Sequence, residues 1–254
     1  MKRIIYTFSL ITLIFLSVSG YAQNKMQSLD ELINKKDPAW PLVQKWLDSA
    51  KNKVEILSVD SSKASQALYN AQVSTYSTLG AVIYNTGGIM IDNGWIRILG
   101  SGSTRLNRDV AEWNKGKTIQ EYGDKPTYFL VADDAVGGFF AINYGAFGED
   151  VKNVYYLAPN SLNWEPLGVG YGEFILFCFD SDLSNFYKGL RWSSWAQFIG
   201  NLDGSKSYSF RPYLWTKEGM DIEKCTRKLV PTADLFNFNL VKQQELSVKE
   251  PEKS

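Results

Sequence analysis

Apolar side chains in the first third of the chain recur at the spacing of an α-helix. Residues 37–50 place their apolar side chains on one helical face, and Asp37 followed by Pro38 is typical of a helix start. Ser28 with Glu31 three residues later is the pattern of a capping box. We therefore predict helices at 28–37, 37–50 and 60–72 in this region, with a short strand at 53–57.

Near residue 80 the pattern changes to short apolar runs separated by turn residues. Such runs are typical of strands, and the Asn-Gly and Gly-Gly pairs favour tight hairpins. Residues 80–103 are predicted to form three strands, with turns at 85–88 and 92–94. Further strands are predicted at 127–132, 138–143, 153–158, 164–168 and 207–216. Helical spacing returns at 171–179, 182–190, 192–200 and from 232 onward.

This order of elements predicts the fold class. Helices precede a set of hairpin-connected strands, and other helices follow it. A run of residues between 101 and 125 is polar and is expected to be a long loop with one short helix near 110–113. We predict an α+β fold, a single domain with a mostly antiparallel sheet flanked by helices.

The N-terminus has the order of a secretory signal peptide. Lys2 and Arg3 precede an apolar run at 4–18, and the small residues Gly20 and Ala22 follow it. An uncleaved membrane anchor is the alternative, but the run is shorter than the roughly 20 residues that a spanning helix needs. We expect residues 1–22 to be removed after Ala22, which leaves a domain at 23–243 and a disordered tail at 244–254. The mature protein is then periplasmic or secreted, without a stable membrane span.

Charge and composition narrow the possible chemistry. Without Lys2 and Arg3 the chain has 25 basic residues (27 − 2) against 27 acidic ones, a net charge of −2, so we expect no nucleic-acid partner. The chain has no histidine, which excludes Ser-His-Asp and Cys-His catalysis. Its two cysteines, Cys178 and Cys225, cannot form a four-thiolate zinc site. We expect no metal ion and no cofactor.

The two cysteines leave a choice open. In an exported protein they are able to form a disulfide. Cys178, however, stands in the apolar run FILFCF, where a buried free thiol is the simpler interpretation.

Asp133 and Asp134, beside Gly137 and Gly138, are the first candidate site. They suggest either an acid pair or hard-cation site, or a hairpin in which aspartate side chains bind turn N–H groups. Adjacent residues on a strand point to opposite faces, so the two carboxylates should not converge. The hairpin explains all four residues, and we favour it.

Trp95 with Arg97, and Trp164 with Glu165, are the second candidate. An exposed tryptophan near a guanidinium can stack on a sugar ring or on a partner's side chain. The alternative is that Trp95 is in the core and that Arg97 pairs with a carboxylate such as Asp92 or Glu165.

Several long segments carry a resemblance to a known family. They include DPAWPLVQKWL, YNTGGIMIDNGWIRILGSG, FLVADDAVGGFFAINYGAFG, VYYLAPNSLNWEPLGVGYGEF and FYKGLRW. In this order they resemble an uncharacterised bacterial family, domain of unknown function 2625, from about Ser28 to about Leu240. The family's activity is unknown, so the resemblance implies membership and no function.

A more distant resemblance concerns the order ADD-x-x-GG-FFAI, VYYL, WEPL and GEFILF. It is similar to the SUKH superfamily, which includes a yeast cell-wall-assembly regulator and many bacterial immunity proteins. That resemblance implies an α+β binding domain that holds its ligand without catalysis. The chain departs from the superfamily in its signal peptide and in long additions after residue 180.

Together these observations predict an exported, non-catalytic, SUKH-like binding domain for a protein or a cell-envelope glycan. One alternative is a periplasmic hydrolase in which Glu165 or Glu173 joins Asp133 or Asp134 across a cleft. A second alternative is a module that binds glycan through its aromatic side chains without cleaving it.

Overall fold

A computed structural model describes residues 25–249 of the chain. The predicted signal peptide, residues 1–22, lies outside this range, as does the end of the predicted tail, residues 250–254. Within the range, the fold is a single α+β domain with a mainly antiparallel sheet, as the sequence predicted.

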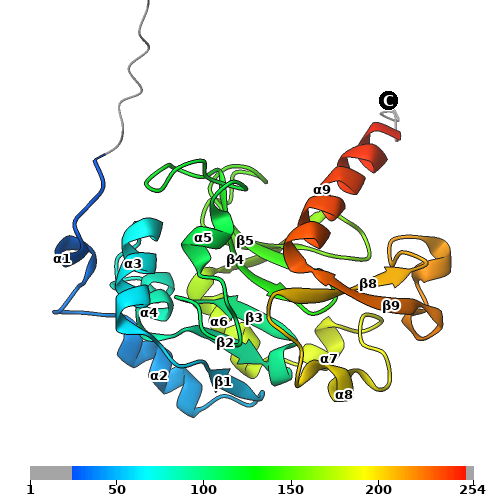
Figure 1. Cartoon of the computed structure of the whole chain (residues 1–254), viewed down its shortest axis with the longest axis horizontal. Coiled ribbons are helices and arrows are strands. Elements are labelled where there is room, and N and C mark those ends of the chain that lie inside the picture. Colours follow the sequence, from blue (N-terminus) through cyan, green and yellow to red (C-terminus); the bar gives the residue numbers. More distant parts are fainter. Residues whose placement is uncertain (1–24, 250–254) are drawn as a thin grey trace, which may run out of the picture.

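Seven antiparallel strands follow one another in chain order to form the main sheet (Figure 1). Each strand pairs with the next, so the topology is a meander with β1 and β7 at the edges. The strands are β1 (Val54–Ile56), β2 (Gly88–Ile91), β3 (Ile96–Leu99), β4 (Tyr128–Asp134), β5 (Phe139–Asn143), β6 (Asn153–Leu157) and β7 (Trp164–Gly170).

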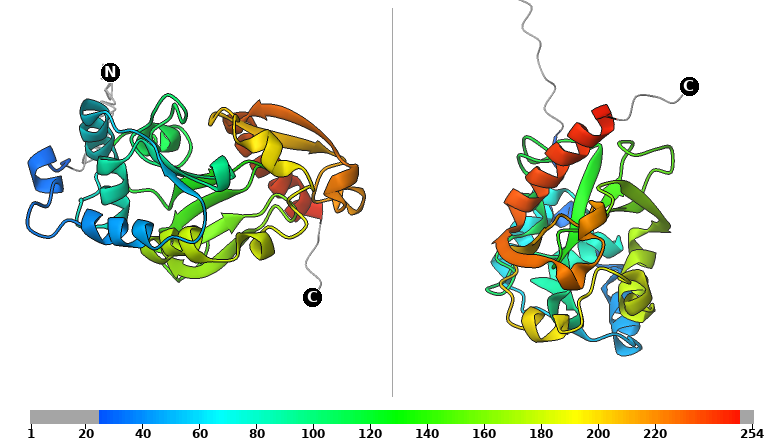
Figure 2. Two further views of the ribbon diagram at one scale, coloured as in Figure 1. Left: turned by 90° about the horizontal axis from the view of Figure 1, so that it is seen from below. Right: turned by 90° about the vertical axis from the view of Figure 1, so that its right-hand side faces the viewer.

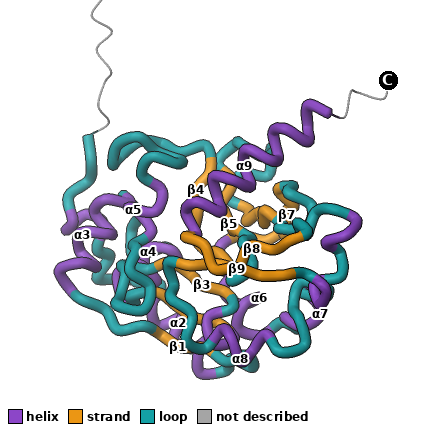
Figure 3. The backbone as a smooth tube through the Cα atoms, turned by 45° about the vertical axis from the view of Figure 1, so that its right-hand side comes forward, coloured by secondary structure: helices purple, strands orange, loops and turns teal. Residues whose placement is uncertain are grey.

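Helices surround this sheet, as the purple and orange tube of Figure 3 makes visible. The helices that precede β4 in the chain are α1 (Leu29–Leu32), α2 (Trp40–Asp48), α3 (Ser61–Ala71), α4 (Thr78–Asn85) and α5 (Val110–Asn114). Those after β7 are α6 (Tyr171–Asp180), α7 (Leu183–Phe186), α8 (Trp195–Ile199) and α9 (Thr232–Lys249). Three single 3₁₀ turns are η1 (Asp92–Gly94), η2 (Lys217–Gly219) and η3 (Ile222–Lys224).

A separate two-stranded hairpin precedes α9. It consists of β8 (Lys206–Arg211) and β9 (Thr226–Pro231), paired antiparallel. Figure 2 shows this hairpin at one end of the long axis and the N-terminal helices at the other.

Both faces of the central strands are covered. Phe139 and Phe140 are neighbours on β5 and therefore point to opposite faces. The ring of Phe139 meets Phe236 of α9 with centroids 4.9 Å apart, whereas Phe140 meets Phe174 of α6, also at 4.9 Å. The sheet is thus sandwiched between α9 and α6, which is why β4 and β5 are almost continuously apolar.

Several local predictions are confirmed. Ser28 and Glu31 form the capping box of α1, and Asp60 caps α3. The strands predicted from residue 127 to residue 168 and the helix at 171–179 are present. Both cysteines are buried free thiols.

Other local predictions were wrong. Residues 78–85 form helix α4 and not a strand, and α2 starts at Trp40 with Ala39 as its N-cap, two residues after the predicted start. Strand β9 was not predicted. Helix α9 continues to Lys249 and so includes residues 244–249, which were expected to belong to a disordered tail.

Candidate functional site

Asp133 and Asp134 end strand β4 and point to opposite faces of the sheet. Asp133 pairs across the ladder with Arg97 on one side and Phe139 on the other, so its side chain lies on the α9 face. Asp134 accepts a hydrogen bond from the hydroxyl of Tyr156, on the opposite face. The two carboxylates therefore do not form one site, as the alternation of strand side chains predicted.

Asp133 lies between two guanidinium groups in the interior. Arg97 Nε donates to Asp133 Oδ1 at 2.6 Å, and Arg108 Nη2 lies 2.5 Å from Asp133 Oδ2. The second contact is an ion pair whose angles are poor for a hydrogen bond. Asp133 and Arg97 have no exposed surface, and Arg108 is 7% exposed. No ligand can reach Asp133 while this arrangement holds.

The two terminal nitrogens of Arg97 also make hydrogen bonds. Its Nη1 donates to the carbonyl of Lys206, and its Nη2 donates to the carbonyl of Asp134 at 2.8 Å and to Ser207 Oγ at 2.6 Å. Arg97 therefore joins the main sheet to β8.

Arg97 pairs with a carboxylate, as one interpretation of the sequence expected, but neither of the partners named there, Asp92 or Glu165, is the one. Asp92 pairs with Arg191 at 2.7 Å, and Glu165 accepts from the Ser161 hydroxyl at 2.7 Å. The residue opposite Arg97 is set by the β3–β4 register, which places Asp133 there.

Asp134 organises the turn between β4 and β5. Its Oδ1 accepts from the N–H groups of Val136 (3.0 Å) and Gly138 (2.7 Å), and its Oδ2 accepts from the Tyr156 hydroxyl at 2.7 Å. Burial raises the pKa of Asp134, and these hydrogen bonds oppose the rise. This is the hydrogen bonding expected of an aspartate in a turn.

The two glycines of this turn are required by its geometry. Gly137 has a φ angle of +86°, a backbone conformation that residues other than glycine rarely adopt. A Cβ on Gly138 would lie 2.3 Å from Asp134 Oδ2. The hairpin interpretation therefore accounts for Asp134 and both glycines, but it was wrong for Asp133, whose carboxylate pairs with Arg97 and Arg108.

Trp95 lies in the aromatic core. It follows η1 in a helical conformation and not in a strand, and it has no exposed surface. Its ring meets Tyr187 at 5.4 Å, Trp192 at 5.9 Å and Trp195 at 5.0 Å. No face of this ring is open to a sugar.

Trp164 and Glu165 lie apart from the buried candidates, on edge strand β7. Trp164 is half-buried and stacks on Phe147 with ring centroids 4.4 Å apart, while Glu165 is exposed. The six candidate residues thus do not form one site. Glu173, named for the hydrolase alternative, accepts the Gly170 N–H at the start of α6.

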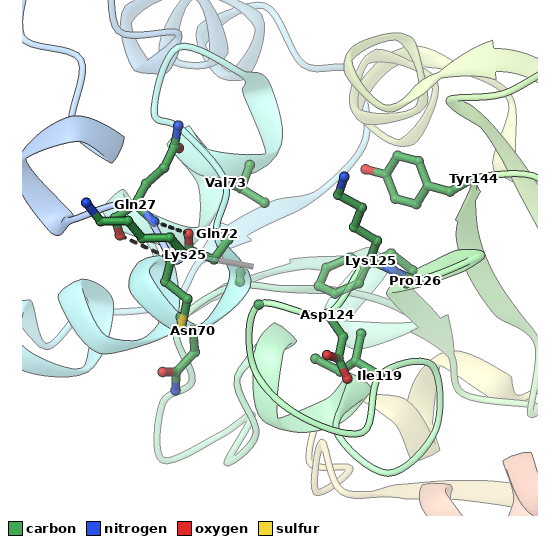
Figure 4. Close-up of a pocket in the computed structure, with 14 residues that line it drawn as sticks. Lys25, Gln27, Asn70, Gln72, Val73, Ile119, Asp124, Lys125, Pro126 and Tyr144 are labelled. Carbon is green, nitrogen blue, oxygen red and sulfur yellow. Dashed lines mark hydrogen bonds between the residues drawn. The ribbon is translucent and has the colours of Figure 1, made fainter. Parts of the chain in front are cut away.

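A pocket of about 520 Å³ opens elsewhere, and we call it the Tyr144 pocket (Figure 4). Its walls come from the N-terminal segment 25–27, the end of α3 and the residues after it (70–73), the loop before β4, and Phe129 and Tyr144. The floor includes the buried side chains of Ile119 and Phe129. Sequence reasoning missed this site because its walls come from separate segments without a common motif.

Polar side chains stand around this apolar floor. In Figure 4, Gln27 and Gln72 lie on one side of the pocket, and Lys125 and Tyr144 lie on the other. Gln27 N–H donates to Gln72 Oε1 at 2.7 Å, and Gln72 Nε2 donates back to the Gln27 carbonyl at 3.2 Å. These two bonds hold the N-terminal segment in place as a wall. Partial burial raises the pKa of the Tyr144 hydroxyl, which therefore stays a neutral donor.

Comparison with known proteins decides the family. The family model described as "Protein of unknown function DUF2625" matches residues 29–235. The chain belongs to this family. A similar protein is "Putative uncharacterized protein YbfG" of Escherichia coli (strain K12), 41% identical over 213 residues, which cover 84% of this chain and 95% of that protein. Another is an "Uncharacterized protein" of Haemophilus influenzae, 37% identical over 223 residues, which cover 88% of this chain and 98% of that protein.

The described part of this DUF2625 chain, residues 25–249, has neither a metal-binding cluster of side chains nor a membrane-spanning helix. In this range no three His, Cys, Asp or Glu side chains gather closely enough to hold a metal ion. No helix in the same range is both long enough and apolar enough to cross a membrane. The resemblance to the SUKH superfamily stays a prediction from the sequence.

Proposed function

We propose that the mature chain is an exported, non-catalytic binding domain for a protein or another cell-envelope component, and that the Tyr144 pocket contacts this ligand. The observation that carries the proposal is the pocket itself. Its volume of about 520 Å³ lies in the range of roughly 300 to 1,000 Å³ typical of ligand pockets. An apolar floor with a few polar groups at the rim is the usual composition of such sites.

The side chains around the pocket support binding over catalysis. Among the described residues that line the pocket, Asp124 is the one carboxylate, and its Oδ2 accepts the N–H groups of Gln120 (3.1 Å) and Glu121 (2.8 Å). A glycosidase needs two carboxyl groups on either side of one bond. Asp133 and Asp134, which the hydrolase alternative would use, are committed to an ion pair and to a turn.

The chemistry of the pocket favours a protein ligand. Ile119 and Phe129 offer an apolar floor that suits an apolar side chain, while Lys125 and Tyr144 offer donors at the rim. An aromatic anchor in a pocket with a polar rim is the usual composition of a protein interface. The sequence resemblance to SUKH binding domains supports the same conclusion.

Photo-crosslinking in living cells tests this proposal. A photo-reactive phenylalanine derivative replaces Tyr144 in the full-length protein, and the control carries it at Tyr76, which is 63% exposed and outside the pocket. We expect an adduct from position 144 and none of the same mass from position 76. Digestion of the adduct with protease or with a glycan hydrolase then identifies the class of ligand, and the mass of the mature protein checks for a start at Gln23.

Two results would contradict the proposal. One is equal crosslinking from both positions, because a specific site should distinguish them. The other is turnover of an envelope substrate by purified protein that is lost when Tyr144 or Lys125 is replaced by alanine.

A further inference from the structure

A second cavity lies beside the buried ion network, and we call it the Arg108 cavity. It has a volume of about 380 Å³ and lies between the segment 107–117 and the start of α9. Arg108, Lys117 and Lys206 line it together with Trp113, Ser205 and Glu112. Three cationic side chains thus face one acidic side chain across the cavity.

The charge balance beneath this cavity is also positive. Asp133 is the shared ion-pair partner of Arg97 and Arg108, so two guanidinium groups are in direct contact with one carboxylate. The exposed Asp203 adds a negative charge that acts on both guanidinium groups from a greater distance. The neighbouring carboxyl of Asp134 is directed to the opposite face, toward Tyr156. Buried charge without a matching counter-charge is costly. An anion in the cavity would supply it.

Arg108 has two buried donor nitrogens without an acceptor among residues 25–249. Its Nη2 donates to the carbonyl of Gly204 at 3.0 Å and pairs with Asp133, but Nε and Nη1 have no partner in the described part of the chain. The side chain is only 8% exposed. An unpartnered donor on a buried guanidinium is unfavourable, and an oxyanion is the acceptor that such groups bind best.

Lys117 reinforces the same site. Its Nζ and the Arg108 Cζ each lie 4.2 Å from the centroid of the Trp113 ring, so one indole holds both cations. Lys117 Nζ also donates to the Trp113 carbonyl at 2.9 Å. Burial, and then the charge of Arg108, lowers the pKa of Lys117, while the exposed Glu112 acts in the opposite direction. Lys117 and Arg108 are therefore close enough for their charges to repel each other, although both lie against the same indole.

The first turn of α9 borders the cavity as well. Pro231 and Ala233 line it, and they flank the start of a helix that runs from Thr232 to Lys249. The N–H of Thr232 already donates to the Ser205 carbonyl at 2.8 Å. The N–H groups of the next residues in a first helical turn lack intrahelical acceptors and favour anions. Asp234, in the same turn, is exposed and is not part of the lining.

We propose that the Arg108 cavity binds a phosphate-type oxyanion, free or as the phosphate group of a larger molecule, against Arg108 and Lys117. A dianion matches the excess of two positive charges among the lining side chains. This site is separate from the Tyr144 pocket and does not depend on the function proposed for that pocket.

Isothermal titration calorimetry of the mature protein with inorganic phosphate tests the proposal. Ionic strength is held constant with sodium chloride, so that screening of surface charges stays the same. We expect saturable binding of phosphate and much weaker binding of acetate, which carries one charge. Absence of saturable phosphate binding by the wild-type protein would overturn the proposal.

Variants locate the binding site. Lys117→Gln should weaken phosphate binding about tenfold or more, because it removes a charged hydrogen-bond donor. Lys115→Gln is the matched control: this lysine is two residues away, is exposed and pairs with Glu121, so affinity should stay the same. Equal effects of the two variants would show a diffuse surface field and refute a built site. Arg108→Lys should also weaken phosphate binding. If the Arg108→Lys protein does not fold, the result for Lys117→Gln decides whether phosphate binds in the Arg108 cavity.

Two further experiments distinguish the Arg108 cavity from the Tyr144 pocket and identify the molecule that carries the phosphate group. Tyr144→Ala should bind phosphate like the wild type; a loss of binding there would contradict the placement at Arg108. Glycerol phosphate is compared with vesicles that contain phosphatidic acid, a lipid with the same phosphomonoester group, at equal phosphate concentration. Tighter binding of glycerol phosphate would identify the ligand as a soluble phosphomonoester, and tighter binding of the vesicles would identify it as a lipid headgroup. Either result counts only if Lys117→Gln weakens the binding.

Discussion

At the scale of single residues, the ion network of Asp133 is the feature with the largest energetic consequence. The carboxylate of Asp133 has no solvent exposure. It forms a hydrogen-bonded ion pair with Arg97 and a second ion pair with Arg108. Breaking a buried pair by removing one partner is strongly destabilising, because the remaining charge is left uncompensated in the interior. The sequence alone could not reveal this, since Asp133 looked like a turn residue.

Replacement of this carboxylate tests its role. Asp133→Asn keeps the shape of the side chain but leaves two buried guanidinium groups without a counter-charge. We expect the free energy of unfolding to fall by about 3–5 kcal/mol, measured by urea denaturation. Glu165→Gln is the control, because that acid is exposed on β7 and its loss should leave the unfolding midpoint nearly unchanged. If both variants unfold at the same midpoint, the ion network does not stabilise the fold.

The sequence predicted the roles of single residues only where those roles are local. The turn chemistry of Asp134, Gly137 and Gly138 follows from neighbouring positions and was predicted. The partner of Arg97 was not predicted, because Arg97 and Asp133 are 36 residues apart in the chain and are paired by the register of two strands. Trp95 left two interpretations open, and burial among three aromatic rings decided between them.

At the scale of elements, α4 was mistaken for a strand because short apolar runs fit both structures. Two local features make it a helix. Ser77 Oγ accepts the Gly80 N–H at 3.1 Å as an N-cap. Gly80 also packs against the chain before the helix, where a Cβ would lie 2.1 Å from the Ser74 carbonyl oxygen. Strand β9 was missed for a different reason, because most of its side chains are polar or exposed and it ends in proline.

The cap of α4 can be tested directly. Ser77→Ala removes the acceptor for the Gly80 N–H, and such a loss typically costs about 1 kcal/mol. Thermal unfolding followed by circular dichroism measures the effect as a lower Tm. Ser61→Ala is the matched control, since Ser61 is an exposed first-turn residue of α3 whose side chain makes no hydrogen bond in the described range. Alanine has a higher helix propensity than serine, so Ser61→Ala should not lower the Tm. A Tm that falls equally in both variants would mean that the loss in Ser77→Ala does not come from the cap.

At the scale of the whole molecule, the α+β class and the antiparallel strands were predictable, because they follow from apolar periodicity and turn residues. The placement of the C-terminal hairpin was not, because it depends on contacts between distant segments. Arg97 binds the Lys206 carbonyl and Ser207, and the Tyr208 N–H donates to the Ala135 carbonyl at 2.7 Å. The two cavities were not predictable for the same reason, since each is lined by segments that are far apart in the chain.

Hydrogen exchange followed by mass spectrometry can test whether these contacts make one cooperative unit. An isolated two-stranded hairpin is only marginally stable in water, so protection of β8 must come from its contacts with the main sheet. We expect amides of β8 to exchange as slowly as those of β4 and β5, and amides of the exposed edge strand β7 to exchange faster. In Asp133→Asn, which weakens the same junction, protection of β8 and β4 should fall together. Fast exchange confined to β8 and β9 in the wild-type protein would instead mean that the C-terminal hairpin opens independently of the sheet.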